Sequence, residues 1–380
     1  MFLYQNIFYL VRGNTQAIWL LKGVEGRLGK KNRMIMLSVH GMQLDELKEW
    51  MSLQGHKPFH AQQLIEWIYA KGILDPALMT TFSLKLRELI AKELSLQTIR
   101  CVKTCLSDDG ETEKFLWELA DGLHVESVLI SSDTRRTVCV SSQVGCPARC
   151  SFCASGKQGL LRQLSTGEII EQVYHIDRVL KEKGERVCHV VFMGMGEPLE
   201  NYEAVVKALR LLSDADRLCI GQRRITVSTV GVVPGIERFA EEGLQVNLAL
   251  SLHAPSQHLR KKIIPYARKY SLEEVLKAVD LFAKKTKRDI TYEYTMLAGI
   301  NDSPSHAEEL AELLRGQKCT VNLIPYNPID GVRFGRPEGG DIEAFRDILS
   351  DLGVRTTWRY TKGKDIAAAC GQLALVGGRG

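Results

Sequence analysis

Strand-like and helix-like segments alternate from Arg136 toward the end of the chain, and this alternation restricts the fold more than any other feature. We predict strands near residues 137–142, 187–193, 223–230, 245–252, 289–297 and 319–325. The helices between and after them are predicted near residues 167–183, 202–213, 234–242, 272–285, 304–315 and 341–352. Strands that are separated by helices in this way form parallel sheets with the helices outside. The sequence therefore predicts an α/β fold, a partial (βα)6 barrel that is open on one side.

The segments before the barrel have a different pattern. "QLDELKEWMSLQG" and "AQQLIEWIYAKG" carry apolar residues three and four apart and end in glycine, which indicates a small helical accessory domain. "EKFLWELADGLHVESVLI" alternates on both sides of Asp121-Gly122, which indicates a β-hairpin extension. The predicted regions are an N-terminal extension at 1–36, the accessory domain at 37–107, the hairpin at 108–135, the barrel at 136–359 and a C-terminal tail at 360–380.

The composition is that of an ordinary globular protein. The chain has 380 residues, 45% hydrophobic and 25% charged, so it can bury a core without disulfides. Its ten cysteines therefore indicate a reducing compartment, the cytoplasm, and metal or catalytic roles. In the first 36 residues, Arg12 and Lys22 interrupt the apolar runs, and no run approaches the roughly 20 residues of a membrane span. We expect no membrane association, and we interpret residues 1–36 as a poorly ordered extension or the product of a misplaced start.

Five unusual motifs follow strands of the predicted barrel. "GCPARCSFCASGKQG" follows the first strand, "GMGEPL" the second, "STVG" the third, "SLHA" the fourth and "PYNP" the sixth. In parallel barrels the working residues lie at the carboxyl ends of the strands. We therefore expect all five motifs to face one cavity.

The first of these motifs places Cys146, Cys150 and Cys153 close together. Zinc normally takes four protein ligands, and no fourth Cys or His follows at zinc spacing. Three thiolates suit a [4Fe-4S] cluster and leave one iron open to another ligand. This Cys-x3-Cys-x2-Cys spacing after a first barrel strand resembles the radical S-adenosylmethionine superfamily. The resemblance implies that the open iron binds the amino and carboxylate groups of S-adenosylmethionine.

The other motifs carry groups that suit this cofactor. Gly196 lets the backbone approach closely, and Glu197 offers a carboxylate to a cationic amine. Small polar side chains after the later strands suit ribose hydroxyls or adenine edges. Taken alone, a tight turn or a structural histidine explains such residues equally well, but their positions beside the cysteine motif favour a shared site. The predicted cofactor-binding residues are Gly196, Glu197, Ser228, Ser251, Leu252, His253 and Asn327.

The motifs taken together resemble the RNA adenine-C2 methyltransferase family over about residues 40 to 375. The segments that carry the resemblance are "CVSSQVGCPARCSFCASGKQGLLRQLSTGEI", "MGMGEPLENY", "ITVSTVG", "LSLHAP", "IPYNP" and "AACGQL". The resemblance implies methylation of an adenosine in 23S rRNA and, in some members, of one beside the tRNA anticodon. It also implies a [4Fe-4S] cluster, two molecules of S-adenosylmethionine per turnover and an electron donor such as flavodoxin or ferredoxin. Basic runs at 260–262, 268–269 and 284–288 would contact RNA phosphates.

The chemistry implied by the resemblance uses two cysteines outside the cluster motif. Carbon 2 of adenine is electron-poor and does not attack an ordinary methyl donor, so the methyl group must be transferred by an indirect route. The resemblance implies that Cys370 first accepts a methyl group, which a thiolate does well. A 5′-deoxyadenosyl radical then activates this methyl group for addition to carbon 2, and Cys139 releases the RNA by a transient disulfide with Cys370. Glu126 matches the family's candidate base, although a lone strand Glu is commonly a surface carboxylate.

Two alternatives remain open at the level of sequence. Methylation of carbon 8 of the same ribosomal adenine uses the same cluster and the same two cysteines, so the motifs separate the two reactions poorly. A non-enzymatic RNA-binding protein with zinc at Cys146, Cys150 and Cys153 is the alternative from another class.

Overall fold

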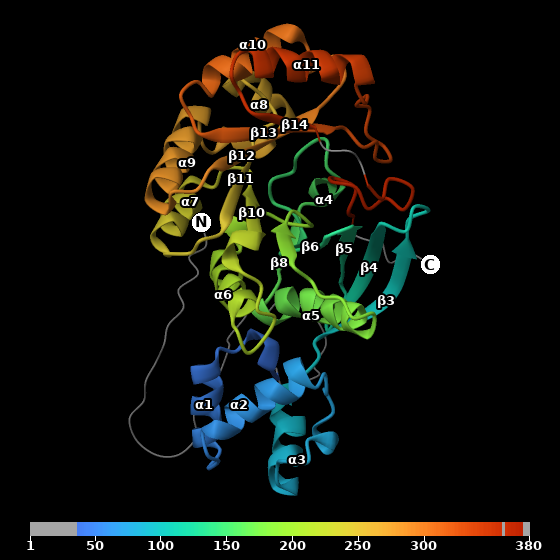
Figure 1. Ribbon diagram of the computed structural model, residues 1–380, viewed down its shortest axis with the longest axis vertical. Helices are drawn as coiled ribbons and strands as arrows, with labels where there is room; N and C mark the ends of the chain where they lie inside the picture. Colours follow the sequence, from blue (N-terminus) through green and yellow to red (C-terminus); the bar gives the residue numbers. More distant parts are fainter. Residues whose placement is uncertain (1–35, 359–361, 375–380) are drawn as a thin grey trace, which may run out of the picture. The chain divides into compact units, whose positions relative to one another are not determined.

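A ten-stranded sheet organises the part of the chain that the computed structural model describes, residues 36–358 and 362–374 (Figure 1). Seven neighbouring strands are parallel, as predicted for a partial barrel. They are β6 (Arg135–Cys139), β9 (His189–Phe192), β10 (Ile225–Thr229), β11 (Asn247–Ser251), β12 (Ile290–Met296), β13 (Cys319–Pro325) and β14 (Thr356–Trp358). The predicted extension at 1–36 lies outside the described residues except for Met36.

Helices cover the outer side of these strands (Figure 1). The predicted ones are α5 (Thr166–Glu182), α6 (Tyr202–Ser213), α7 (Val233–Glu241), α9 (Leu272–Thr286), α10 (Pro304–Leu313) and α11 (Gly339–Asp351). The short helix α8 (Gln257–Ile263) and the three-residue strand β14 were not predicted, because neither is long enough to show a periodic pattern. In the described part of the chain, no helix is long and apolar enough to cross a membrane.

Local sequence explains where these elements begin and what they bury. The Ser165 hydroxyl accepts a hydrogen bond from the backbone of Glu168, and the Glu168 carboxylate accepts one from the backbone of Ser165. This reciprocal cap starts α5 at Thr166, one residue before the predicted start. Strand β12, "ITYEYTM", is buried at nearly every position, as expected for a strand with helices on one side and a barrel interior on the other.

The predicted hairpin extends the same sheet beyond β6. Strands β4 (Thr112–Leu119) and β5 (His124–Ser132) pair antiparallel, and β5 pairs with β6. A further strand, β3 (Ile99–Leu106), pairs with β4 at the sheet edge, inside the range predicted for the helical domain. Most of its side chains are exposed, so it lacks the polar–apolar alternation that identifies a strand in a sequence.

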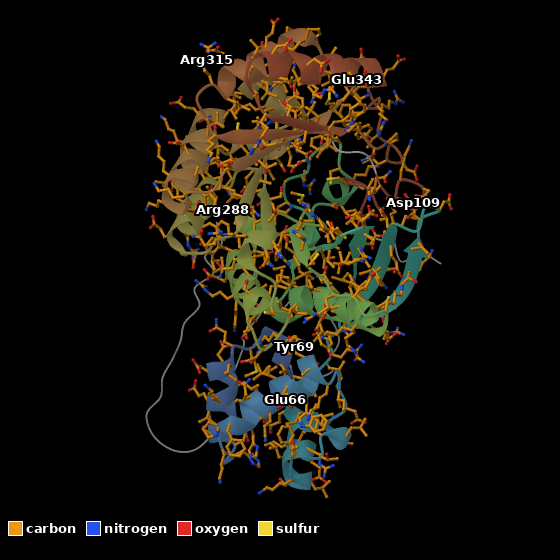
Figure 2. All side chains as sticks on the ribbon, viewed as in Figure 1. Glu66, Tyr69, Asp109, Arg288, Arg315 and Glu343 are labelled. Carbon is orange, nitrogen blue, oxygen red and sulfur yellow. The ribbon has the colours of Figure 1, made fainter. Side chains whose placement is uncertain are left out.

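Helices α1 (Leu44–Leu53), α2 (Phe59–Ile65) and α3 (Leu84–Glu93) form the predicted helical region, and a π-helical turn at Glu66–Ala70 follows α2. Tyr69 of this turn lies on the side toward the barrel (Figure 2). Its hydroxyl oxygen lies 2.8 Å from Nδ1 of His40 and 3.3 Å from Nη1 of Arg217, and both partners are buried. Buried polar contacts therefore join the helices to the barrel, while the domain boundaries stay predictions.

Candidate active site

The cysteine motif lies on a tight loop at the carboxyl end of β6. Short strands β7 (Gln143–Gly145) and β8 (Leu160–Gln163) close the loop around the one-turn helix α4 (Ala154–Lys157). Gly145 has φ +78°, and a Cβ atom there would lie 1.9 Å from the carbonyl oxygen of Gly159. A larger residue at position 145 would therefore force the loop open.

The thiols of Cys146, Cys150 and Cys153 are half-buried against an apolar cluster. Burial raises the pKa of Cys146 to about 12 and also raises the pKa values of Cys150 and Cys153. Iron deprotonates the thiols that it binds, so this pocket suits metal-bound thiolates and disfavours unbound ones. The buried residues of this apolar cluster are Ala148, Phe152, Val230, Ala254, Ile263, Ile264, Ala267, Leu297 and Tyr326.

The number of these cysteines fits an iron–sulfur cluster better than a structural zinc ion. A structural zinc site takes four protein ligands, whereas three thiolates can hold a four-iron cluster and leave one iron open.

The second motif holds a carboxylate between two strand ends. Glu197 is 2% exposed; one of its oxygens accepts a 3.1 Å hydrogen bond from Leu199 N and the other a 2.7 Å bond from Val230 N. Burial raises the pKa of Glu197 to about 7. Gly196 has φ +110°, and a Cβ atom there would meet Ser142 Oγ at 2.7 Å. The motif therefore packs against Ser142 and Gln143, at the start of the strand β7 that closes the cysteine loop.

The third and fourth motifs bring two hydroxyls together. The Oγ atoms of Ser228 and Ser251 lie 3.3 Å apart at the ends of β10 and β11. Leu252, in contrast, has a fully buried side chain, and its backbone N donates to the carbonyl oxygen of Glu293 at 3.1 Å. The two serines thus hold their hydroxyls side by side, whereas the side chain of Leu252 belongs to the packing beneath them.

His253 contacts the cysteine loop directly. Its ring meets the ring of Phe152 edge-on, with centroids 4.9 Å apart. Nδ1 of His253 accepts a 2.9 Å hydrogen bond from Thr295 N, and burial lowers the pKa of the imidazole to about 3. The side chain is therefore neutral and carries its proton on Nε2, which is a single hydrogen-bond donor.

Arg260 is a site residue that the sequence pattern misassigned. It was predicted to contact RNA phosphates as part of a basic run, but its side chain is 0% exposed. The guanidinium donates to the carbonyl oxygens of Leu252 (3.2 Å), Ser251 (3.2 Å) and Val230. Cys150 and Glu197 lie close enough to act on its charge. The prediction is wrong for Arg260, because α8 turns this residue inward while Lys261 and Lys262 stay exposed.

The C-terminal tail, residues 362–374 of the described chain, is docked on the cysteine loop. Cys370 is exposed, and the backbone of Cys370, Gly371 and Leu373 is held by hydrogen bonds. The tail thereby brings the predicted methyl acceptor beside α4 and the end of β13. The bonds are Asn327 Nδ2 to Cys370 O (3.2 Å), Ala154 N to Gly371 O (2.8 Å), Ser155 Oγ to Leu373 O (2.6 Å) and Gln372 Nε2 to Pro328 O (3.0 Å).

Glu126 also contacts the tail. It is 4% exposed, so the alternative interpretation of Glu126 as a surface carboxylate is wrong. One oxygen lies 3.0 Å from Nζ of Lys114, and the other accepts a 2.9 Å hydrogen bond from Ala374 N. Lys114 also donates to the carbonyl oxygen of Ala367 at 3.2 Å. The Glu126–Lys114 pair thus binds the tail at two points, a role that the sequence did not indicate.

Cys139 is half-buried at the end of β6, on the face that Glu126 occupies. It pairs with Val128 of β5, two residues after Glu126. Side chains two residues apart on a strand point the same way, and directly paired residues share a face. The structure therefore gathers the predicted residues from the ends of β6, β9, β10, β11 and β13, together with Glu126 and the tail.

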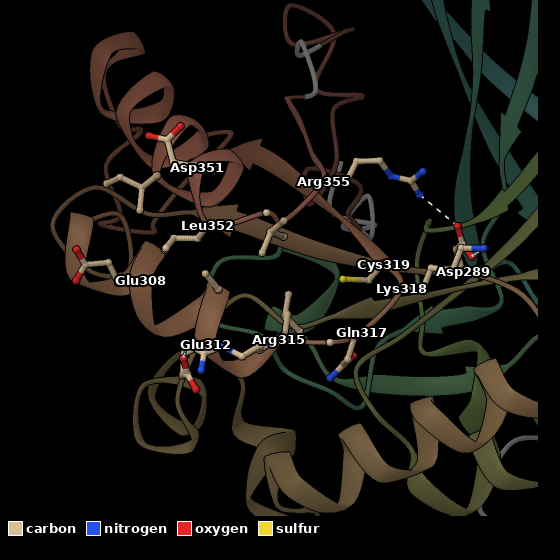
Figure 3. Close-up of a pocket in the computed structure, with 16 residues that line it drawn as sticks. Asp289, Glu308, Glu312, Arg315, Gln317, Lys318, Cys319, Asp351, Leu352 and Arg355 are labelled. Carbon is tan, nitrogen blue, oxygen red and sulfur yellow. Dashed lines mark hydrogen bonds and ion pairs between the residues drawn. The ribbon is translucent and has the colours of Figure 1, made fainter.

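A cavity of about 760 Å³ lies elsewhere in the barrel (Figure 3). Asp289 before β12, Cys319 at the start of β13 and Arg355 before β14 line it, so it opens at the amino ends of the strands. Asp289 and Arg355 form an ion pair across it, with 3.4 Å between nitrogen and oxygen. This cavity is separate from the candidate active site.

Two family models match the chain. The model of the radical SAM superfamily matches residues 140–314, which include the cysteine loop and the second to fifth strand ends. The model described as the ribosomal RNA large subunit methyltransferase N-terminal domain matches residues 37–96. A radical SAM methyltransferase from Sphaerobacter thermophilus, solved as a crystal structure, is 44% identical, with a TM-score of 0.87 over 89% of this chain and 99% of that one.

Two curated relatives cover most of the chain and are named as RNA methyltransferases. A probable dual-specificity RNA methyltransferase RlmN 2 from Protochlamydia amoebophila is 62% identical over 87% of this chain and 92% of its own length. A probable dual-specificity RNA methyltransferase RlmN from Geobacillus thermodenitrificans is 45% identical over 91% of this chain and 94% of its own. The chain belongs to the RlmN family. As an RlmN-family protein it is a radical S-adenosylmethionine RNA methyltransferase, and its cofactors are a [4Fe-4S] cluster and S-adenosylmethionine. The non-enzymatic zinc alternative is therefore wrong.

Proposed function

We propose that this chain methylates carbon 2 of an adenosine in 23S rRNA and of an adenosine in tRNA, in the cytoplasm. The observation that carries the proposal is the docking of Cys370 beside the cysteine loop, where a methyl-accepting thiol would be needed. The dual-specificity names of the relatives support two RNA substrates, and the RNA-methyltransferase model over the N-terminal helices supports an RNA-contacting role for them.

In this proposal, Cys146, Cys150 and Cys153 hold the [4Fe-4S] cluster, which when bound supplies the electron that cleaves S-adenosylmethionine. Glu197 would receive the amino group of that cofactor, and Ser228, Ser251 and the Nε2–H of His253 would orient its polar edges. Asn327 would act at the same end of the barrel while its amide holds the tail. Leu252 would contribute only packing. A flavodoxin or ferredoxin would supply this electron to the cluster.

Cys370 would carry the methyl group and Cys139 would release the product. Both oxygens of Glu126 are engaged while the tail is docked, one by Lys114 and one by Ala374 N. Departure of the tail toward RNA would leave one oxygen of Glu126 without its backbone donor. Glu126 would then be able to take a proton from the substrate. Cys370 would therefore accept its methyl group before Glu126 removes the proton.

The product decides between carbon 2 and carbon 8. We expect reconstituted enzyme, reduced anaerobically with S-adenosylmethionine and an rRNA fragment, to form 2-methyladenosine, identified by mass spectrometry against both standards. The same assay on tRNA tests the second substrate. A product dominated by 8-methyladenosine would overturn the proposal.

The two-cysteine chemistry predicts a trapped intermediate. We expect Cys139→Ala to accumulate RNA covalently bound through Cys370, because no thiol remains to release it. Gel analysis after ribonuclease digestion, with mass spectrometry of the Cys370 peptide, measures the adduct. Cys188→Ala is the matched control, since Cys188 is also half-buried but lies before β9, at the opposite end of the sheet. Full turnover without adduct in Cys139→Ala would refute the assignment.

A further inference from the structure

Tyr326 of the "PYNP" motif has no role in the chemistry described above. It follows β13 directly and is 1% exposed. Its ring belongs to the apolar cluster against which the three cluster cysteines pack, and it meets the ring of Phe334 edge-on at 6.0 Å. Its backbone is fixed as well, because Tyr326 N donates to Met296 O at 3.1 Å.

The hydroxyl of Tyr326 is buried and forms no hydrogen bond with any part of the described chain. The backbone N–H of Ile329 acts on the hydroxyl oxygen, but as a donor it cannot accept the O–H proton. Buried hydroxyls without an acceptor are uncommon in folded proteins and call for an explanation by a missing partner. The missing partner must be an acceptor.

The surroundings of this hydroxyl indicate which acceptor is missing. Cys153 lies close enough for its charge to act on the hydroxyl, and Cys146, Cys150 and Cys153 all pack against the apolar cluster that contains the Tyr326 ring. Thiolate and sulfide sulfur atoms accept hydrogen bonds once iron is bound, and hydrogen bonds to sulfur help to set the reduction potential of a cluster. The site of the cluster is therefore where the acceptor would appear.

We propose that the Tyr326 hydroxyl donates a hydrogen bond to sulfur of the iron–sulfur cluster at Cys153. The inference rests on the proposed assignment of the three cysteines as cluster ligands. The bond stabilises the reduced cluster, which carries one more negative charge than the oxidised one. Tyr326 thereby makes the cluster easier to reduce and holds it against β13.

Tyr326→Phe tests this directly, because it removes one hydroxyl and keeps the ring that fills the pocket. We expect the full-length variant, reconstituted anaerobically without S-adenosylmethionine, to bind the same iron and sulfide as the natural chain but to have a more negative reduction midpoint. The midpoint is measured by electron paramagnetic resonance during reductive titration. Tyr292→Phe is the matched control: its ring is also fully buried, but its hydroxyl bonds to Gln317 at the amino end of β12.

The outcomes separate this inference from the function on which it rests. A natural chain that assembles no cluster refutes the ligand assignment. An assembled cluster whose midpoint is the same in Tyr326→Phe overturns the inference alone. Unchanged potential with weakened S-adenosylmethionine binding also overturns it, since the acceptor would then lie on the cofactor. If Tyr326→Phe loses the cluster, the second variant carries 3-fluorotyrosine at position 326, whose hydroxyl is a stronger hydrogen-bond donor. We expect this variant to have a less negative reduction midpoint than the natural chain. An unchanged midpoint would overturn the inference.

Discussion

Arg260 is a cation buried beside the candidate cluster site, with its guanidinium committed to three backbone carbonyls. Burial lowers its pKa to about 10, so it stays charged at neutral pH. Those carbonyls belong to Val230, Ser251 and Leu252, at the ends of β10 and β11. Arg260 therefore stabilises the strand ends that carry Ser228 and Ser251.

We predict that Arg260→Met lowers the free energy of unfolding by about 2–4 kcal/mol, because it leaves buried carbonyl groups without a donor. Lys261→Met, one residue later on the exposed side of α8, is the control and should change it by no more than about 0.5 kcal/mol. Urea unfolding of the metal-free chains measures both. Equal effects would mean that the two basic residues are equivalent, as their sequence suggests.

The tail is the element whose position matters most for the proposed chemistry. It has no regular secondary structure to hold it, so it depends on side chains from other elements: Lys114 and Glu126 of the hairpin, Ser155 of α4 and Asn327 after β13. Apolar packing adds to these bonds, because Ala368 and Leu373 are buried in the core and Ile366 packs against it.

We predict that Lys114→Met speeds amide hydrogen exchange in residues 363–374. The variant loses the ion pair with Glu126 and the bond to Ala367 O, and a local loss of about 1–2 kcal/mol corresponds to roughly 5–30-fold faster exchange. Mass spectrometry of tail peptides measures the rate. Lys103→Met, on the exposed edge strand β3, should leave the tail unchanged. Unaltered exchange in Lys114→Met would show that the pair does not hold the tail.

For the whole molecule, the junction between the helical region and the barrel is a buried polar network. His40 contacts Tyr69 at 2.8 Å and the carbonyl oxygen of Leu96 at 3.1 Å, while Glu171 of α5 accepts a hydrogen bond from Thr98 N at 2.6 Å. Burial lowers the pKa of His40 to about 4; Glu171 opposes this shift, whereas His175 and Arg217 add to it. The network holds a neutral imidazole.

This network predicts a loss of stability in mild acid. Unfolded His40 binds a proton below about pH 6.5 and folded His40 only below about 4, so its contribution is present at neutral pH and falls between these values. At pH 5 the loss is about 2 kcal/mol relative to pH 7.5. We expect His40→Gln to show a smaller drop between these two pH values in urea unfolding, with exposed His258→Gln as the control. An equal drop in both variants would contradict the prediction.

Much of the barrel could be predicted because its signals are local. The strands and the long helices repeat apolar residues at fixed intervals within a single segment, and α5 begins at a cap formed by residues three apart. The exposed edge strand β3, the seven-residue helix α8 and the three-residue strand β14 lack such intervals. Their formation depends on pairing and packing with distant segments.

The sequence by itself determined the cysteine motif, the strand-end motifs and their common edge, because parallel strands place their carboxyl ends together whatever their packing. Only the tertiary structure decided that Arg260 is buried while Lys261 is exposed, that Glu126 holds the tail and that the Tyr326 hydroxyl lacks an acceptor. Each of these facts depends on which residues from distant parts of the chain exclude water from a side chain. Burial of this kind arises from packing and has no signature in a single segment.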